Sequence, residues 1–194
     1  MAANAAPVLT PAQYLATERA AEFRSEYVNG EIYAMSGGLL PHAQLMAQFS
    51  RELADALEHR PCLVTVADLR LQVTEAGAYL YPDVMVICDK PAYADGHRDM
   101  ITNPSVVVEV LSESTERWDR GGKFVQYRQV ASLREYVLVS QTEMRVEWFT
   151  RGSNGEWLYR EAVGVDGVCR LQDLGIDLKL ERVYRKVEGL QPAL

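Results

Sequence analysis

The sequence contains no hydrophobic run long enough to cross a membrane. A membrane helix needs about 20 consecutive apolar residues, whereas the richest apolar stretches here are residues 79–88 and 106–111. The first nine residues lack the basic and then apolar pattern of a secretion signal. We therefore expect no membrane association and a cytoplasmic location.

Cysteine is also scarce, with three residues in a chain of 194. Cys62 and Cys88 lie in apolar, strand-like surroundings, and Cys169 is far from both. Such positions favour buried free thiols over disulfides. No cysteine or histidine spacing is typical of a zinc site. These features predict a reducing compartment and no structural zinc.

A basic excess is missing as well, because the formal net charge is −7. Proteins that bind nucleic acid over a broad surface are usually basic, since neutralising phosphates supplies much of the affinity. Any contact with nucleic acid therefore has to depend on a local basic region, on a metal ion or on both. The composition, 48% hydrophobic and 24% charged, is that of one globular domain. We place this domain at residues 9–187, between short tails at residues 1–8 and 188–194.

The order of predicted elements favours an α/β (α+β) fold with a single mixed central sheet flanked by helices. A capping box at Thr10 predicts a helix over residues 10–22. The pair Asn29-Gly30 between two β-rich runs predicts a β-hairpin. The other predicted elements are strands at residues 62–67, 69–74, 79–88, 105–111, 135–140, 144–150 and 156–161, and helices at residues 41–58, 119–131 and 180–187.

Two acidic residues interrupt strands that are otherwise apolar. Glu109 lies within residues 106–111, where an unpaired buried carboxylate would be costly. The alternatives are an acid on the exposed face of an edge strand or one paired with an arginine. Asp83 follows Pro82 at the entry to another apolar strand, a position that turn formation also explains. Neighbouring strands would bring both carboxylates to one divalent cation, which prefers oxygen ligands.

A basic segment follows these strands. Residues 117–134 carry Arg117, Arg120, Lys123, Arg128 and Arg134 against the single acid Asp119. Scattered basic residues usually mark the solvated face of a helix. The alternative is a helix that faces phosphates, with one lysine directed at a metal ion.

In their order, these motifs resemble the Uma family of restriction endonucleases, a branch of the PD-(D/E)XK nuclease superfamily. The similar segments are Pro82-Asp83-Val84, Val108-Glu109-Val110-Leu111-Ser112-Glu113-Ser114-Thr115, the trio Asp119, Lys123 and Tyr127, and Glu135-Tyr136-Val137-Leu138-Val139. Upstream, the hairpin with Glu26 and the later His42 are similar to the opening segment of the family. The similarity runs from residue 9 to residue 180.

The resemblance implies a restriction-endonuclease-like fold that hydrolyses phosphodiester bonds of DNA with Mg²⁺, for which Mn²⁺ substitutes. It implies metal binding by Asp83, Glu109 and the Val110 carbonyl, and catalysis by these two acids together with Lys123 and Glu26. The superfamily pattern has its lysine two residues after the second acid, where this sequence has Leu111. A lysine supplied by the following helix, Lys123, would replace it.

The same resemblance suggests further contacts. Arg117, Arg120 and Arg128 would position the nucleic-acid backbone without reading its sequence. His42 and Tyr127 would be accessory residues, although helix capping or packing explains His42 equally well. Analogy with relatives also suggests a homodimer.

Two other classes of function stay open, since fold alone does not choose among them. A catalytically silent module with a nuclease fold would bind nucleic acid or protein. The acidic net charge favours this class, and the complete set of Asp83, Glu109 and Lys123 counts against it. A metal-dependent hydrolase of small phosphate esters would need no wide basic surface.

Overall fold

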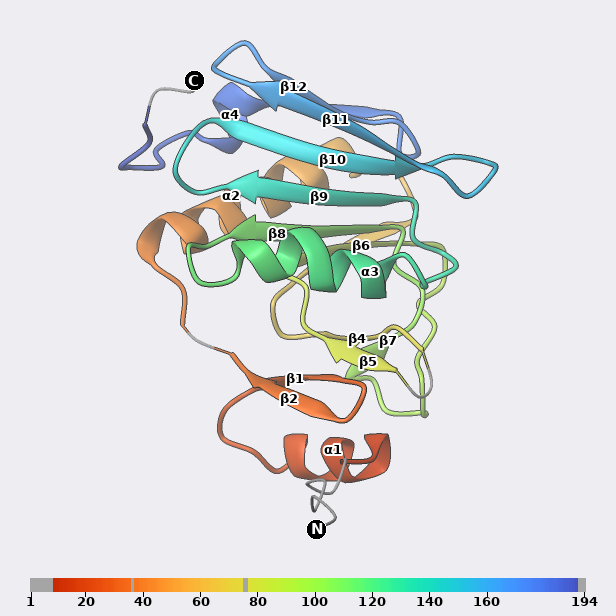
Figure 1. Cartoon of the computed structure of the whole chain (residues 1–194). Helices are drawn as coiled ribbons and strands as arrows, with labels where there is room; N and C mark the ends of the chain where they lie inside the picture. The colour runs from red at the N-terminus through yellow and green to blue at the C-terminus, as the bar shows by residue number, and fades with distance from the viewer. Residues whose placement is uncertain (1–8, 36, 75–76, 192–194) are drawn as a thin grey trace.

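A mixed six-stranded sheet forms the centre of this computed structural model, which describes residues 9–35, 37–74 and 77–191 (Figure 1). Its middle strands, β8 (Val106–Leu111) and β9 (Glu135–Ser140), pair in parallel and are buried at every position. Burial on both faces explains why β8 is apolar at consecutive residues. The strand order is β11 (Trp157–Val163), β10 (Arg145–Arg151), β9, β8, β6 (Val84–Cys88) and β3 (Cys62–Val66).

Helices cover both faces of this sheet (Figure 1). α2 (Leu40–Ala56) packs Phe49 and Leu53 against the face of β8 that carries Val108. The π-helix η1 (Trp118–Lys123) and α3 (Phe124–Tyr127) lie over the other face. Side chains alternate between faces along a strand, so Glu109 belongs to the face of η1 and α3.

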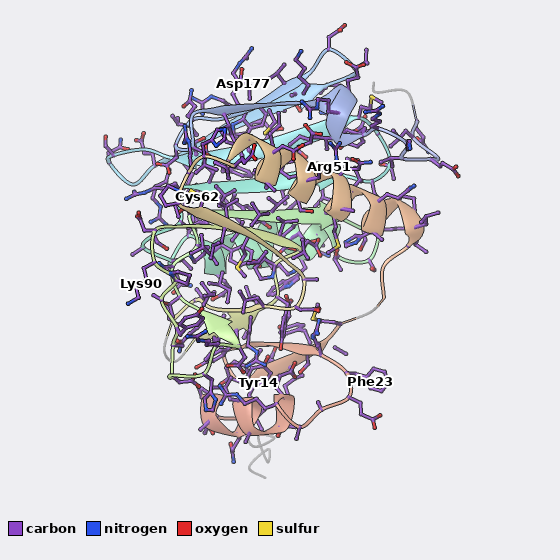
Figure 2. All side chains as sticks on the ribbon, turned by 180° about the vertical axis from the view of Figure 1, so that it is seen from behind. Tyr14, Phe23, Arg51, Cys62, Lys90 and Asp177 are labelled. Atoms are coloured by element: carbon purple, nitrogen blue, oxygen red, sulfur yellow. A yellow bond between two sulfur atoms is a disulfide. The ribbon has the colours of Figure 1, made fainter. Side chains whose placement is uncertain are left out.

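A second sheet of five strands lies beside the first, and α1 (Pro11–Glu18) packs on it (Figure 1). Its order is β2 (Glu31–Ala34), β1 (Ser25–Val28), β5 (Ala78–Leu80), β4 (Arg70–Gln72) and β7 (Met100–Ile101). Buried Tyr14 stacks on Tyr27 in its core, while Phe23 points outward and is 82% exposed (Figure 2). A third, two-stranded sheet of β12 (Val168–Leu171) and β13 (Ile176–Lys179) precedes α4 (Leu180–Val183).

The α+β class is thus confirmed, but the strands divide among three sheets instead of one. Residues 79–88, expected as one strand, form β5 and β6 in different sheets. The break falls at Pro82, which has no backbone N–H for a sheet hydrogen bond. Asp83 therefore lies where the chain passes from the smaller sheet to the larger one.

The predicted capping box and hairpin turn are confirmed, although α1 ends at Glu18 and not at residue 22. The hydroxyl of Thr10 accepts a hydrogen bond from the Gln13 N–H, and the Gln13 side chain accepts one from the Thr10 N–H. Asn29 and Gly30 have φ values of 50° and 97°, as their hairpin turn requires. The basic-segment helix is shorter than expected, because α3 ends at Tyr127.

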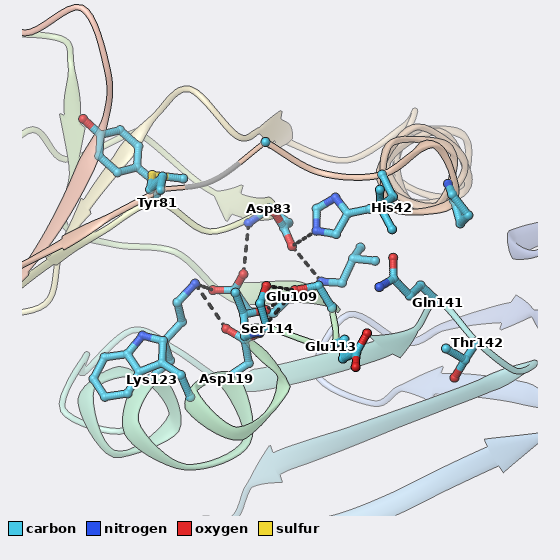
Figure 3. Close-up of a pocket in the computed structure, with 18 of the residues that line it drawn as sticks. His42, Tyr81, Asp83, Glu109, Glu113, Ser114, Asp119, Lys123, Gln141 and Thr142 are labelled. Carbon is cyan, nitrogen blue, oxygen red and sulfur yellow. Dashed lines mark hydrogen bonds and ion pairs between the residues drawn. The ribbon is translucent and has the colours of Figure 1, made fainter.

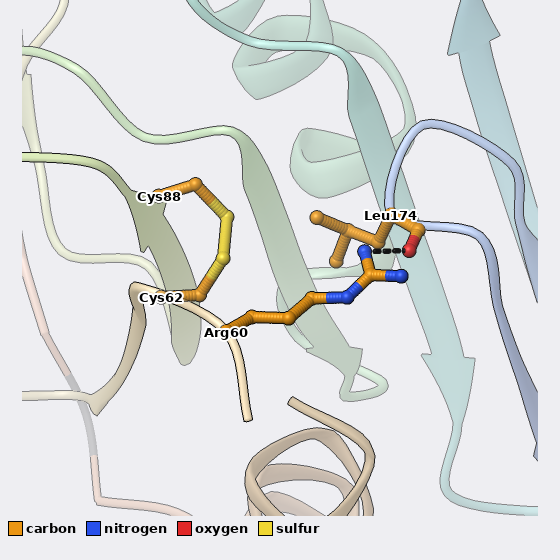
Figure 4. Close-up of a disulfide and its surroundings, with 4 residues drawn as sticks. All are labelled: Arg60, Cys62, Cys88 and Leu174. Carbon is orange, nitrogen blue, oxygen red and sulfur yellow. Dashed lines mark hydrogen bonds between the residues drawn. A yellow bond between two sulfur atoms is a disulfide. The ribbon is translucent and has the colours of Figure 1, made fainter. Parts of the chain in front are cut away.

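The prediction for the cysteines is wrong, because Cys62 and Cys88 form a disulfide (Figure 4). They are directly opposite each other in the antiparallel pair β3–β6, a register that the sequence alone does not reveal. The disulfide removes the free-thiol argument for a reducing compartment. Cys169 is free and buried. Next to this bond, the Arg60 guanidinium donates a hydrogen bond to the Leu174 carbonyl (Figure 4).

Residues 188–191, expected within a C-terminal tail, pack on the domain. The Gln191 N–H donates a hydrogen bond of 2.6 Å to the Thr142 carbonyl, and Glu188 and Gly189 line the main cavity. The predicted N-terminal tail, residues 1–8, lies outside the described residues.

Candidate active site

A cavity of about 1050 Å³ lies between the hairpin, the start of α2, the end of β8 and η1 (Figure 3). It collects the acids, the lysine and the histidine expected at the site, although they come from distant parts of the sequence. These lining residues are Glu26, His42, Asp83, Glu109, Val110 and Lys123.

Asp83 and Glu109 are direct neighbours. β6 and β8 are antiparallel, with Val84 opposite Val108, so the residue before β6 meets the middle of β8. The Asp83 N–H donates a 3.4 Å hydrogen bond to Oε2 of Glu109. The Val110 N–H donates a 2.7 Å bond to Oδ2 of Asp83. The expected adjacency of the two acids is therefore present.

Lys123 lies among three carboxylates, and Figure 3 shows two of them, Glu109 and Asp119. Its Nζ is 3.1 Å from Oε1 of Glu109, 3.2 Å from Oε1 of Glu26 and 3.3 Å from Oδ1 of Asp119. All four side chains are buried. Glu26 and Lys123 thus occupy the places expected of them, and Lys123 reaches the strand carrying Glu109 from the following helix.

Gly122 of η1 lies directly against the side chain of Trp118. A Cβ at Gly122 would lie 1.8 Å from the indole ring of Trp118, so only glycine fits beneath that ring. Asp119 and Lys123 are four residues apart and share a helix face. Single turns of π-helix are rare in proteins overall, but those that occur are often found at functional sites.

The site contains more acidic than basic side chains. Burial raises the pKa of Glu109 well above its usual range, against the attraction of Lys123. Burial also raises the pKa of Asp119. Burial alone would lower the pKa of Lys123, but Glu109, Glu26 and Asp119 outweigh it and raise that pKa well above its ordinary value. Lys123 is therefore a permanent ammonium group at neutral pH.

Two further side chains hold the acids. The hydroxyl of buried Tyr127 donates a 2.6 Å hydrogen bond to Oε1 of Glu109. Nε2 of His42 lies 3.3 Å from Oδ2 of Asp83 (Figure 3). Burial would lower the pKa of His42, but hydrogen bonds with Asp83 and with the Val110 backbone raise it above its usual value. His42 thus contacts the groups expected to bind the metal, whereas the sequence left capping or packing equally open.

The chemistry of these donors fits a divalent cation. Carboxylate and carbonyl oxygens are the ligands that Mg²⁺ prefers, and a nearby cation would favour the charged forms of the buried Glu109 and Asp119. Among the described residues, no three His, Cys, Asp or Glu side chains already stand together as a ligand set. Lys123 and Tyr127 bind Glu109 instead, and His42 binds Asp83.

The three arginines expected to contact nucleic acid do not line this cavity. Arg120 is paired with Glu116 at 2.7 Å and with Glu147 at 2.5 Å. The guanidinium of Arg128 lies over the ring of Phe124 at 5.4 Å. Arg117 lies next to Arg120 in a shallow, more open depression.

Sequence reasoning missed Asp119 as part of the site and treated it as a helix start. Its position four residues before Lys123 was the available signal, because an acid and a lysine at that spacing meet on one helix face. The aromatic residues Tyr33 and Trp118 and the acids Glu113 and Glu188 also line the cavity. Nothing in their local sequence marks them.

The comparisons with known proteins agree with this architecture. A crystal structure of "a putative nuclease belonging to DUF820" from Anabaena variabilis has the same fold, with a TM-score of 0.74 and 14% identity over 91% of this chain and 97% of that chain. The molecule thus shares the α+β fold of that protein, and its cavity is lined by acidic residues. Residues 11–181 match the Uma2 family, described as "Putative restriction endonuclease", and the chain belongs to this family.

Two curated relatives come from Synechocystis sp. (strain ATCC 27184 / PCC 6803 / Kazusa). The uncharacterized protein sll1609 is 38% identical over 81% of this chain and 89% of its own length. The uncharacterized protein slr1290 is 35% identical over 92% of this chain and 93% of its own length. Within the described part of this chain, no helix has the length and apolar character needed to span a membrane.

Proposed function

We propose that this protein is a metal-dependent endonuclease that hydrolyses phosphodiester bonds of DNA at the cavity containing Asp83, Glu109 and Lys123. Membership of a restriction-endonuclease family supports the reaction. The observation that carries the proposal is the buried contact of 3.1 Å between Lys123 and Glu109 beside Asp83. Two neighbouring acids and one fixed ammonium are the groups that metal-assisted phosphoryl transfer requires.

Asp83, Glu109 and the Val110 carbonyl would hold Mg²⁺ or Mn²⁺. When bound, such an ion polarises the scissile phosphate and lowers the pKa of a coordinated water. His42 brings a nitrogen donor within 3.3 Å of Asp83. Carboxylate and carbonyl oxygens suit both Mg²⁺ and Mn²⁺, so we expect either ion to serve.

Lys123 would stabilise negative charge instead of removing a proton. Its raised pKa keeps it protonated at neutral pH, which excludes it as a general base there. A fixed ammonium aimed at the phosphate stabilises the charge that develops in the transition state. Glu26 would position this lysine. Oε1 of Glu26 accepts a 3.1 Å hydrogen bond from the Tyr81 N–H and also contacts the ammonium group of Lys123. Tyr127 would fix the carboxylate of Glu109.

The charge of the cavity makes the ion a condition for binding phosphate. The acids that line it are Glu26, Asp83, Glu109, Glu113, Asp119 and Glu188. Lys123 is the one lysine or arginine among its described lining residues. A phosphodiester would be repelled by this wall until a divalent cation offsets it.

Cleavage of labelled DNA tests the proposal. Purified protein is incubated with single-stranded and duplex DNA, and with RNA, in Mg²⁺, in Mn²⁺ and in EDTA. We expect ion-dependent products from the wild type and from the control Asp68→Asn, whose side chain is 76% exposed, but none from Asp83→Asn. Absence of cleavage in both ions with every substrate would contradict the proposal and favour the catalytically silent module. The predicted homodimer is checked separately by light scattering.

A further inference from the structure

Two aromatic rings form one wall of the cavity. Tyr33 lies on β2 and Trp118 begins η1. Their ring centroids are 5.1 Å apart with an interplanar angle of 19°, so the rings are stacked. Both residues line the cavity that contains Glu109 and Lys123. The stack therefore lies beside the proposed reaction centre and joins the hairpin to the helix carrying the lysine.

Each ring of the stack has a further contact. Trp118 lies against the backbone of Gly122, where a Cβ would come within 1.8 Å of the indole ring. The indole also stacks on the ring of Tyr33. The hydroxyl of Tyr33 donates a 2.8 Å hydrogen bond to the Glu31 carboxylate, which fixes the ring orientation. Tyr33 remains 37% exposed although Trp118 covers one side of it.

An exposed aromatic face of this kind is a surface on which nucleobases stack, whatever their sequence. A base within a duplex is already stacked on both sides and offers only its edges in the grooves. Only an unpaired base has a free face for Tyr33. The position of the stack would then bring the adjoining phosphate toward Lys123.

The charges of the cavity favour the same substrate. Duplex DNA is bound largely through cations that neutralise its dense phosphates. Here the expected contact residue Arg120 is already paired with Glu116 and Glu147, and the cavity wall is acidic. Stacking does not depend on charge, and a single strand carries a lower charge density than a duplex. Affinity therefore has to come from stacking and from the ion.

We propose that Tyr33, supported by Trp118, is a subsite for an unpaired nucleobase next to the scissile phosphate. This inference rests on the proposed function for the identity of its substrate. It makes single-stranded or locally unpaired DNA the preferred substrate over intact duplex.

The test measures binding of oligonucleotides that contain 2-aminopurine, whose fluorescence falls when the base stacks on an aromatic ring. Single-stranded and fully paired versions are titrated with protein in Ca²⁺, and the same strands are then tested for cleavage in Mn²⁺. Tyr33→Leu keeps an apolar side chain on Trp118, and Tyr33→Phe keeps the ring. Tyr93→Leu is the matched control, because Tyr93 is 41% exposed and does not line the cavity.

We expect wild type, Tyr33→Phe and Tyr93→Leu to quench the 2-aminopurine fluorescence of the single strand. These proteins should also bind the single strand more tightly than the duplex. Tyr33→Leu is expected to abolish this quenching and to lower the affinity for the single strand by about 10-fold. Equal affinity of wild type and Tyr33→Leu, preference for the duplex, or no binding at all would each overturn the subsite.

Failure of the proposed function gives a different result. Quenching that depends on Tyr33, together with no cleavage in any ion, would support the base subsite and contradict the proposed nuclease activity. Cleavage of duplex and single strand at equal rates by both wild type and Tyr33→Leu would retain the nuclease and reject the subsite.

Discussion

The ammonium nitrogen of Lys123 lies 3.1 Å from Oε1 of Glu109, and both side chains are buried. Lys123 belongs to η1 and Glu109 to β8, so this contact fixes the helix to the central strand. The same ammonium is shared with Glu26 and Asp119. Lys123 is therefore part of the stability of the site as well as of its proposed chemistry.

Replacing Lys123 by methionine is expected to lower the free energy of unfolding by about 3–5 kcal/mol, because buried carboxylates lose their partner. Mn²⁺ should restore part of this loss by replacing the missing positive charge. Urea unfolding with and without Mn²⁺ measures both effects. Lys90→Met, at an exposed position, is the control and should leave stability unchanged. An unfolding midpoint of Lys123→Met at the same urea concentration as that of the wild type would contradict the pairing of Lys123 with the buried carboxylates.

Replacing His42 by alanine is expected to weaken Mn²⁺ binding by about 10–100-fold, the range found when a group next to a metal ligand is lost. Mg²⁺ binding should fall by a similar factor, since His42 acts through Asp83 and both ions prefer the same oxygen ligands. Isothermal titration calorimetry with both ions gives the two affinities. His59→Ala, at an exposed position, is the matched control. Unchanged affinity for both ions would remove His42 from the metal site.

Glu135 predicts a pH dependence of stability far from the cavity. Its carboxylate accepts hydrogen bonds from the Gln172 N–H and from Thr150, but burial raises its pKa from 4.5 to about 7. The folded state thus binds this proton more tightly than the unfolded chain. The resulting stabilisation is complete below pH 4.5 and is lost as the pH rises through about 7.

Glu135→Gln stays neutral at every pH and keeps the accepting oxygen. Between pH 5 and pH 8, we expect Glu135→Gln to lose about 2–3 kcal/mol less of its free energy of unfolding than the wild type loses. Urea unfolding at several pH values measures this difference, with exposed Glu156→Gln as the control. Parallel pH profiles for wild type and Glu135→Gln would show that Glu135 has an ordinary pKa.

The disulfide predicts a thiol count. Protein denatured without reductant should contain one reactive thiol, from Cys169, and three after reduction. Reduction should also cost about 2–4 kcal/mol of stability, because the link closes a loop between residues 26 positions apart. The Cys62→Ser, Cys88→Ser double variant should not respond to reductant. Three thiols in the unreduced protein would disprove the disulfide.

Local signals in the sequence were sufficient for the secondary structure near the N-terminus and for β8. The capping box at Thr10 and the Asn29-Gly30 turn act through contacts between near neighbours, so a short window contains all the information. Glu109 was conspicuous because β8 is buried on both faces. An acid in such a strand is costly without a partner.

Pairings over long range were not predictable in the same way. The disulfide depends on the register of β3 and β6, and the division into several sheets depends on where the chain turns at Pro82. The stack of Tyr33 on Trp118 joins segments that only the tertiary fold brings together. Asp83 stood out at the entry to an apolar strand, whereas the resemblance to a family supplied Glu26 and assigned Lys123 to the same site.

The location of a bound ion tests the central claim most directly. Crystals of the wild-type protein soaked in Mn²⁺ are measured at the manganese absorption edge, and an anomalous difference map is calculated. We expect one strong peak within about 2.6 Å of oxygens from Asp83, Glu109 and Val110, and its loss in Asp83→Asn. A peak elsewhere in the acidic cavity, or no peak at saturating Mn²⁺, would contradict the account.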